Sequence, residues 1–351
     1  MASPERQIEF LSNLQRLLAE GSFVSTYKYA LLLSLADLCV ELGRDDDAPL
    51  EIPTRRIGEK FTEYYWRQCA PYLPAGGEDD RVLKQNTGDP PRIIKLLQAV
   101  RGACEDSLVN LRRDEKVWNR TVTEVAAQVR KMPLWKLQTV GTQKLDFLYD
   151  NSGGLTGITL KSGVGFCFRK HYPLVVDLVK GAWAQYVRRY NAIRLAEKTD
   201  LQEFLFGSER ASLDVVRPIV WRFQSGTCFY CRRPLEEGTG HVDHFIPWSR
   251  YPVDLGHNFV VVHAGCNGQK SDHLPAAQHL DAWVDHNQNI GRVKAREFER
   301  RGVVHDLATS ARVINWAYRQ TAGFNGLTWV KAKELEPLPP DWSHLLVTLL
   351  N

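Results

Sequence analysis

Three short stretches decide how the second half of this chain folds. Residues 228–231 read CFYC, residues 241–247 read HVDHFIP and residues 257–272 read HNFVVVHAGCNGQKSD. Two of them carry paired metal-ligand residue types with two residues between the members, namely Cys228 with Cys231 and His263 with Cys266. Two such pairs, about thirty residues apart, predict one closed tetrahedral site for a structural zinc ion.

A redox Cys-x-x-Cys motif is the competing interpretation of Cys228 and Cys231. It does not predict a second ligand pair at the same spacing, so zinc is favoured. The other four cysteines, Cys39, Cys69, Cys104 and Cys167, stand alone among apolar or helical neighbours and are expected to be buried thiols. An odd total of seven cysteines also argues against a disulfide framework.

Between and after the zinc ligands lie polar residues that zinc does not need. Asp243 and His244 end a short strand pattern, and a second strand pattern follows over residues 258–262. Asn267 then opens a helical stretch. The predicted order is strand, loop, strand and helix, with a polar side chain at each junction.

This arrangement resembles the HNH endonucleases, the zinc-knuckled branch of the ββα-metal nucleases. The resemblance covers about residues 224–273 and rests on Asp-His-x-x-Pro, the later Asn, the Cys-Asn pair and the Lys three positions on. The HNH domain of RNA-guided CRISPR effector nucleases has the same spacing. His263 departs from the pattern, since many relatives have a third cysteine there. The resemblance implies a metal-dependent endonuclease that hydrolyses phosphodiester bonds, with double-stranded DNA as the expected substrate.

Residue roles follow from the resemblance together with the chemistry. His244 is expected to be the general base, because an imidazole titrates near neutral pH. Asp243 and Asn267 offer oxygen ligands to a catalytic Mg²⁺ or Mn²⁺ ion. The resemblance implies that Asn258 orients the catalytic loop, and Lys270 is expected to contact phosphate.

Each of these residues has a plainer interpretation on its own. An Asp-His pair is often a surface pair, and an asparagine often a turn residue or helix cap. All of them occur together at nuclease spacing among the predicted zinc ligands, which favours the catalytic interpretation over the plainer ones. Two alternatives stay open: a zinc-stabilised nucleic-acid-binding module without cleavage, and a nuclease subunit that is active only in a complex.

Net charge does not by itself predict a nucleic-acid partner, since the 351-residue chain carries only +4. Residues 228–273 have a net charge of −1, whereas residues 292–301 have +3. The latter segment is a candidate phosphate-binding flank, although a solvated helix face explains it nearly as well. The candidate substrate-binding side chains, besides Lys270, are Arg250, Arg292, Lys294 and Arg296.

The length exceeds that of one average domain, and the predicted fold class is α+β, mostly α. Residues 1–205 are expected to form a helical domain with a small β-hairpin near residues 155–168. Residues 206–300 are expected to form the HNH module, and residues 301–351 a helical and strand extension. Nothing in residues 1–205 indicates a chemistry, so a protein partner or a restriction of target choice is only a hypothesis, as is a role in bacterial restriction or phage defence.

The beginning of the chain carries Glu5, Arg6 and Glu9 where a secretory signal needs an apolar core. The most apolar stretch, residues 29–40, is too short to span a bilayer. The sequence therefore predicts a cytoplasmic protein.

Overall fold

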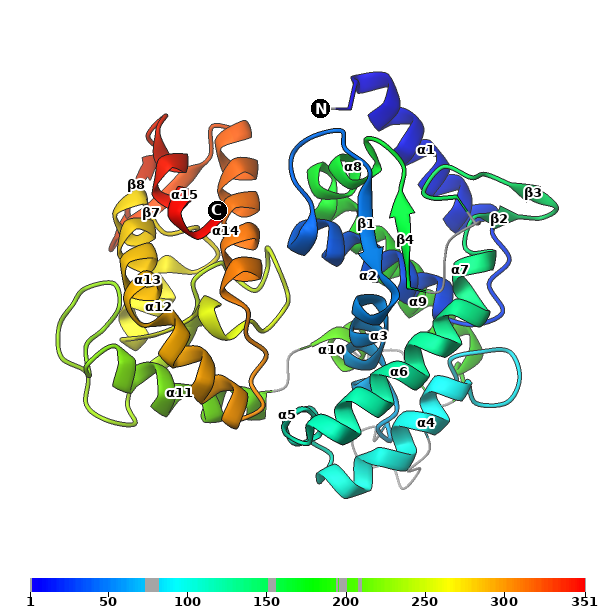
Figure 1. Cartoon of the computed structure of the whole chain (residues 1–351), viewed down its shortest axis with the longest axis horizontal. Coiled ribbons are helices and arrows are strands. Elements are labelled where there is room, and N and C mark those ends of the chain that lie inside the picture. Colours follow the sequence, from blue (N-terminus) through cyan, green and yellow to red (C-terminus); the bar gives the residue numbers. More distant parts are fainter. Residues whose placement is uncertain are drawn as a thin grey trace. The chain divides into compact units, whose positions relative to one another are not determined.

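The computed structural model describes residues 2–72, 82–150, 156–193, 195, 201–207 and 210–350. Over these ranges the chain is mostly helical, with small two-stranded antiparallel sheets, which is the α+β composition expected. The chain divides into two compact units, Met1–Gly207 and Ser208–Asn351 (Figure 1). No helix of the described ranges is both long and apolar enough to cross a membrane.

The N-terminal unit is built around one buried helix. Its helices are α1 (Pro4–Glu20), α2 (Tyr27–Leu42), α3 (Thr54–Gln68), α4 (Arg92–Arg101), η1 (Gly102–Cys104), α5 (Leu108–Arg113), α6 (Glu115–Lys131), α7 (Pro133–Lys136), α8 (Val164–Lys170), α9 (Tyr172–Tyr190) and α10 (Leu201–Phe206). Helix α2 is buried from Tyr27 to Glu41, because apolar residues surround its axis and α3, α8 and α9 pack against it.

Helices α3 and α6 lie side by side in Figure 1 and approach closely at Gly58. A Cβ atom at Gly58 would lie 2.9 Å from the Cβ of Ala126 and 3.0 Å from the carbonyl oxygen of Val122. Only a glycine leaves room for this contact. The two helices pack tightly there for that reason.

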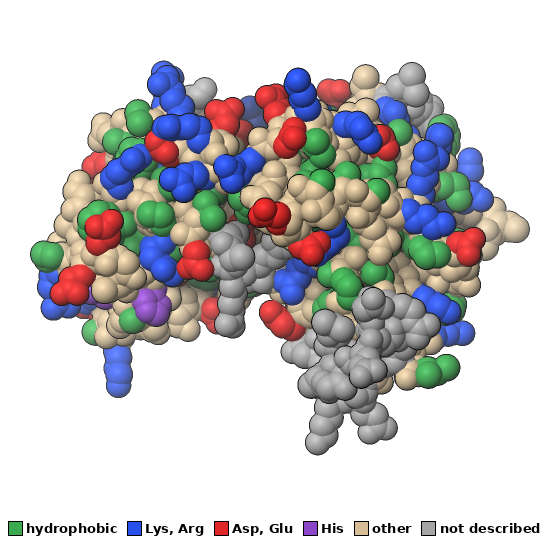
Figure 2. Space-filling model, turned by 90° about the horizontal axis from the view of Figure 1, so that it is seen from below, with side chains coloured by type: hydrophobic (Ala, Val, Ile, Leu, Met, Phe, Trp, Pro, Cys, Tyr) green, Lys and Arg blue, Asp and Glu red, His purple; other side chains and the backbone are tan. Residues whose placement is uncertain are grey.

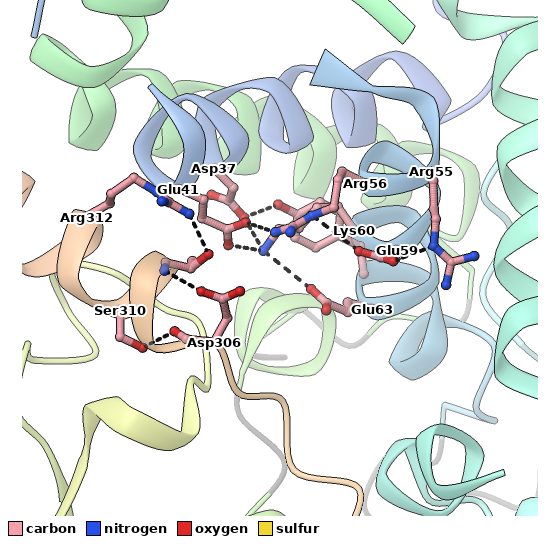
Figure 3. A network of polar contacts seen from close by, with 12 residues as sticks. Asp37, Glu41, Arg55, Arg56, Glu59, Lys60, Glu63, Asp306, Ser310 and Arg312 are labelled. Atoms are coloured by element: carbon pink, nitrogen blue, oxygen red, sulfur yellow. Dashed lines mark hydrogen bonds and ion pairs between the residues drawn. The ribbon is translucent and has the colours of Figure 1, made fainter. Parts of the chain in front are cut away.

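A buried ion-pair network joins α2 to α3 (Figure 3). The Lys60 ammonium lies 2.6 Å from Oε1 of Glu41, and an Arg56 nitrogen lies 2.8 Å from Oε2 of the same carboxylate. Asp37 accepts hydrogen bonds from the hydroxyls of Tyr64 and Tyr172. Burial raises the pKa of Asp37, and the hydroxyls and Lys60 oppose that rise. Each buried charge thus has a partner, as the low-polarity interior demands.

The predicted hairpin near residues 155–168 does not form. The strands of this unit are β1 (Leu50–Pro53), β2 (Thr139–Val140), β3 (Gln143–Lys144) and β4 (Gly157–Leu160). β4 pairs with β1, more than 100 residues earlier, with Leu50 opposite Leu160. Residues 164–168, expected as the second strand, lie in α8, and residue 155 lies outside the described ranges. Gly163, at φ +79°, begins a helix and not a turn between strands.

The C-terminal unit surrounds a two-stranded sheet with helices. Its elements are α11 (Arg210–Phe223), β5 (His241–His244), η2 (Gly256–Asn258), β6 (Phe259–Val262), α12 (Ala264–Lys270), α13 (Ala277–Arg300), α14 (Leu307–Gly323), β7 (Leu327–Lys331), β8 (Glu334–Pro337), η3 (Trp342–Leu346) and α15 (Val347–Leu350). All four residues of β6 are buried. α11 packs against both strands, and Phe245, just after β5, stacks on Trp283 of α13 at 5.9 Å between ring centroids.

β5 and β6 form the strand pair that carries the functional motif. Their antiparallel register sets Asp243 opposite Val260 and His244 opposite Phe259. The side chain of Gln224 bonds both the N–H and the carbonyl of Val261, at 2.8 and 2.7 Å, which satisfies the outer edge of β6. Residues beyond 300 pack on the same sheet region, because Trp329 exchanges backbone hydrogen bonds with Leu274 and Ala276.

Candidate active site and metal centre

The four predicted zinc ligands meet in one place. The ligand atoms of Cys228, Cys231, His263 and Cys266 all lie within 4.8 Å of one another. Among the residues that the structure describes, no other group of His, Cys, Asp or Glu side chains forms such a cluster. Three sulfurs and one imidazole are the donor set that a structural zinc ion prefers.

The orientation of His263 fits a ligand role. Its Nδ1 faces the cluster, 3.3 Å from the Cys231 sulfur, while its Nε2 lies 3.1 Å from the Pro234 carbonyl oxygen. A carbonyl accepts only from an N–H, so Nε2 carries the proton and Nδ1 keeps its lone pair for a metal. His263 therefore offers a fourth donor atom to the cluster beside the three sulfurs.

The thiols of the cluster oppose one another's ionisation. Burial and the neighbouring Cys228 and Cys231 raise the pKa of Cys266 to about 12. Burial also disfavours the Cys231 thiolate, but hydrogen bonds at its sulfur, those from Arg233 first among them, lower the pKa of Cys231 to about 6. One thiolate therefore forms readily while the next is penalised. A bound dication would counter that repulsion.

Asp243 is a buried carboxylate at the C-terminal end of β5, and two side chains hold it. The Tyr230 hydroxyl donates to its Oδ2 at 2.7 Å. The Lys270 ammonium lies 2.9 Å from Oδ2 and 3.1 Å from Oδ1. Tyr230 lies between Cys228 and Cys231, and Lys270 is the last residue of α12. Two segments about forty residues apart in the sequence therefore orient this carboxylate.

His244 ends β5 and is largely enclosed. Its ring lies between Phe259 and Trp248, with centroids 4.8 and 5.2 Å away. Its Nε2 lies 2.8 Å from Oδ1 of Asp254, and its side chain is 13% exposed. The imidazole is thus held by aromatic packing and by one carboxylate, with a small part open to solvent.

Asn258 holds the chain segment that follows His244. Its Oδ1 accepts from the N–H of Ile246 at 2.7 Å, and its Nδ2 donates to the carbonyl of the same residue at 3.1 Å. Its own carbonyl accepts from the N–H of Phe245 at 2.7 Å. Three hydrogen bonds from one asparagine therefore fix the backbone of residues 245–246 beside the imidazole.

Asn267 lies in α12, one residue after the zinc ligand Cys266, and is half-buried. α12 begins at Ala264 and not at Asn267, so Asn267 sits inside the helix instead of opening it. Ligation of His263 and Cys266 would fix the start of this helix, and through it the position of Asn267.

Two of the predicted substrate-binding side chains are corrected by the structure. Lys270 is fully buried, and its ammonium bonds Asp243 and the His244 carbonyl. Lys294 is 1% exposed within α13, and Nζ lies 3.4 Å from Oδ1 of Asn287. Both point inward because their positions fall on packed helix faces, so neither presents its charge to a substrate here.

The three predicted arginines lie nearer the solvent. Arg292 and Arg296 are exposed on α13, whereas Arg250 is half-buried and bonds the Asp272 carbonyl and the Thr321 hydroxyl. On the face seen in Figure 2, Lys and Arg side chains are mixed with Asp and Glu, in agreement with the mild net charge. Of the five predicted substrate-binding side chains, only Arg292 and Arg296 are exposed.

Sequence reasoning assigned no role to Tyr230 or Asp254. Tyr230 lies between two zinc ligands and is read most simply as a packing residue. Asp254 stands ten residues after His244 in a loop of irregular structure, so no periodicity links the two. Only the folded loop reveals that each contacts a motif residue.

Two sequence families match separate parts of the chain. The sequence family described as "HNH endonuclease" matches residues 228–276, which confirms the resemblance drawn from the motif. The family described as "Domain of unknown function (DUF8808)" matches residues 7–205, more than half of the chain. The search of curated proteins found no match.

Proposed function

The chain belongs to the DUF8808 family and carries an HNH endonuclease domain, and from this premise we propose that it is a metal-dependent endonuclease that hydrolyses phosphodiester bonds of double-stranded DNA. One observation carries the proposal. Asp243 and His244 share the end of one strand: Tyr230 bonds Asp243, Lys270 bonds the His244 carbonyl, and Asn258 bonds Ile246 just beyond the strand. A binding module without cleavage would not need this polar array behind its strand.

The residues fit two kinds of metal ion. The sulfur and imidazole donors of Cys228, Cys231, His263 and Cys266 suit structural zinc. The oxygens of Asp243 and Asn267 suit Mg²⁺ or Mn²⁺, which keep their remaining positions for water and phosphate. Lys270 neutralises Asp243 in the structure, but a carboxylate has further lone pairs to offer. When bound, the catalytic ion would stabilise negative charge on the phosphate oxygens.

Within this proposal the protein side chains divide the work. His244 takes the proton of the attacking water, whose oxygen bonds to phosphorus as the bond to the leaving oxygen breaks. Asn258 keeps the catalytic loop in place through the backbone of Ile246. Lys270 and Tyr230 are positioning residues that fix the orientation of Asp243.

Substrate contacts are proposed for Arg250, Arg292 and Arg296, because the motif region itself carries a net charge of −1 and cannot hold a polyanion alone. The N-terminal domain, of a family without known function, is proposed to bind a protein partner or to limit target choice. A role in bacterial restriction or phage defence and a location in the cytoplasm complete the proposal. A reducing compartment suits it, because the three ligand cysteines must remain thiols.

The deciding experiment is cleavage of supercoiled plasmid by the purified full-length protein with Mg²⁺ or Mn²⁺. We expect nicked and linear products from the wild type and a loss of about 10²- to 10⁴-fold for His244→Ala. His241→Ala is the matched control, because His241 lies on the same strand but is exposed. It should cut like the wild type.

Other outcomes separate the alternatives. Equal cutting by His244→Ala and wild type would reject this site. DNA binding without cutting by any variant would favour the zinc-stabilised binding module. Cutting that appears only after addition of a cell extract would favour a subunit active in a complex.

A further inference from the structure

The contact between His244 and Asp254 has a specific geometry. Nε2 of the imidazole lies 2.8 Å from Oδ1 of the carboxylate, and the two side chains are 13% and 27% exposed. A carboxylate that is ionised can only accept, so the proton on Nε2 points at Asp254. The remaining ring nitrogen, Nδ1, then carries the lone pair.

We propose that Asp254 is a positioning residue that fixes the tautomer and ring orientation of His244, so that Nδ1 is the atom that accepts the proton from the attacking water. This inference rests on the proposed function of His244 as general base. A carboxylate that accepts a hydrogen bond from the imidazole of a general base has two effects. It determines which ring nitrogen is free to accept a proton, and it stabilises the positive charge that appears when that nitrogen is protonated.

The loop that carries Asp254 is anchored on its C-terminal side. Leu255 is buried, and the N–H of Gly256 donates to the carbonyl of Val304 at 2.7 Å. A Cβ at Gly256 would lie 2.7 Å from the ring of Phe298, so the backbone there is pressed against α13. The position of Asp254 is therefore set by the packing of its loop on later parts of the same unit.

The ring of His244 is also constrained on its other sides. Phe259 and Trp248 flank it, and the Lys270 ammonium bonds the His244 carbonyl at 2.9 Å. With the ring plane restricted by these contacts, the carboxylate decides which nitrogen bears the proton. An exposed ion pair with no such restraint would be worth little.

The test is a double-mutant cycle in the full-length protein. Asp254→Ala is expected to lower kcat by about 10²-fold while KM stays within a factor of two or so, because a general base supplies about 10² to 10⁴ in rate and this change leaves it present but misoriented. In a His244→Ala background, Asp254→Ala should cost almost nothing further, because its effect acts through the imidazole.

Two more variants give an intermediate case and a control for the change in kcat. Asp254→Asn keeps an acceptor oxygen and loses the charge, so its kcat should fall between those of wild type and Asp254→Ala. Glu237→Ala removes an exposed carboxylate of the same module and should leave kcat unchanged. Zinc content and thermal unfolding are measured for every variant to identify a general loss of folding.

Three results would overturn the inference while leaving the nuclease intact. These are wild-type kcat in Asp254→Ala, a rise in KM in place of a fall in kcat, and an undiminished effect of Asp254→Ala when His244 is already alanine. Absence of metal-dependent cutting by the wild type would reject the proposed function itself, and this inference with it.

Discussion

The hydroxyl of Tyr230 donates a hydrogen bond of 2.7 Å to Oδ2 of Asp243. Tyr230 stands between Cys228 and Cys231, two members of the candidate zinc cluster. One hydrogen bond therefore connects this part of the chain to β5, the strand that carries Asp243 and His244. The phenol is buried, and both burial and the carboxylate raise its pKa well above the usual value, which keeps it a donor. The segment between two cysteines of the candidate zinc cluster thereby fixes the orientation of the Asp243 carboxylate.

Replacement of Tyr230 by phenylalanine tests this connection. We expect Tyr230→Phe to fold and retain zinc, but to need about 10- to 100-fold more Mg²⁺ for half-maximal cleavage, as is typical when a partner of a ligating carboxylate is lost. Tyr318→Phe is the control, because it also removes a buried hydroxyl, one bonded to the Pro275 carbonyl at 2.6 Å. An equal change in Mg²⁺ demand for both variants would contradict the prediction.

Removal of a zinc ligand should affect one unit of the protein only. Cys228→Ser is expected to lose bound zinc and to leave the C-terminal unit sensitive to protease, because a structural zinc site supplies folding free energy directly. The N-terminal unit has its own core and should stay resistant. Metal analysis and limited proteolysis measure both effects. Cys104→Ser, at a thiol outside the cluster, should behave like the wild type.

Loss of the Asn258 side chain should weaken the catalytic loop. Asn258→Ala leaves the N–H and carbonyl of buried Ile246 without their partners, which we expect to cost about 2–4 kcal/mol in unfolding free energy and most of the cleavage rate. Asn258→Asp keeps an acceptor oxygen but loses the donor, so its unfolding free energy and its cleavage rate should lie between those of the wild type and Asn258→Ala. Urea unfolding and plasmid cleavage check both, against the exposed Asn289→Ala. Wild-type stability in Asn258→Ala would refute the prediction.

Burial of Lys294 makes stability depend on pH. Burial lowers the pKa of this amine from 10.5 to about 7, so between these values the unfolded state binds a proton that the folded state does not. Stability from this group therefore rises with pH over that range, and its penalty is largest at pH 7 and below. Lys294→Met should remove the penalty.

We expect Lys294→Met to stabilise the protein by about 1–4 kcal/mol at pH 7, because an apolar side chain replaces a poorly paired buried cation. The gain should shrink toward pH 10, because the unfolded amine begins to lose its proton as the pH approaches 10.5 and the penalty for burying a neutral amine falls. Urea unfolding at the two pH values measures it. The exposed Lys333→Met should show neither the gain nor its pH dependence. A gain that is equal at both pH values would point to packing alone.

The zinc ligands and the strand, loop, strand and helix order could be predicted because they depend on local spacing. Cys228 with Cys231 and His263 with Cys266 each bring two donor atoms together over three residues of chain, in a cluster that could hold a metal, and the HNH resemblance is confirmed by the family match. The hairpin near residues 155–168 was wrong for the opposite reason. β4 finds its partner β1 over 100 residues away, and short apolar segments do not reveal distant partners.

The two lysines predicted to bind substrate, Lys270 and Lys294, also show what sequence spacing cannot predict. A basic run in the sequence does not say which face of α13 each side chain occupies, and the structure buries Lys294 while Arg292 stays exposed. Lys270 looked like a phosphate contact, yet it is the buried partner of Asp243. The net charge of a segment does not show which of its side chains face the solvent.

The sequence alone predicted the HNH resemblance that the family match confirms, because metal ligation and general-base catalysis demand particular side chains at close spacing along the chain. Tertiary structure alone decided what supports them: Tyr230 against Asp243, Asp254 against His244 and Asn258 against Ile246. The physical reason is that these contacts form only when loops close and elements pack. Their partners follow from the path of the backbone in space and from no repeat or period in the sequence.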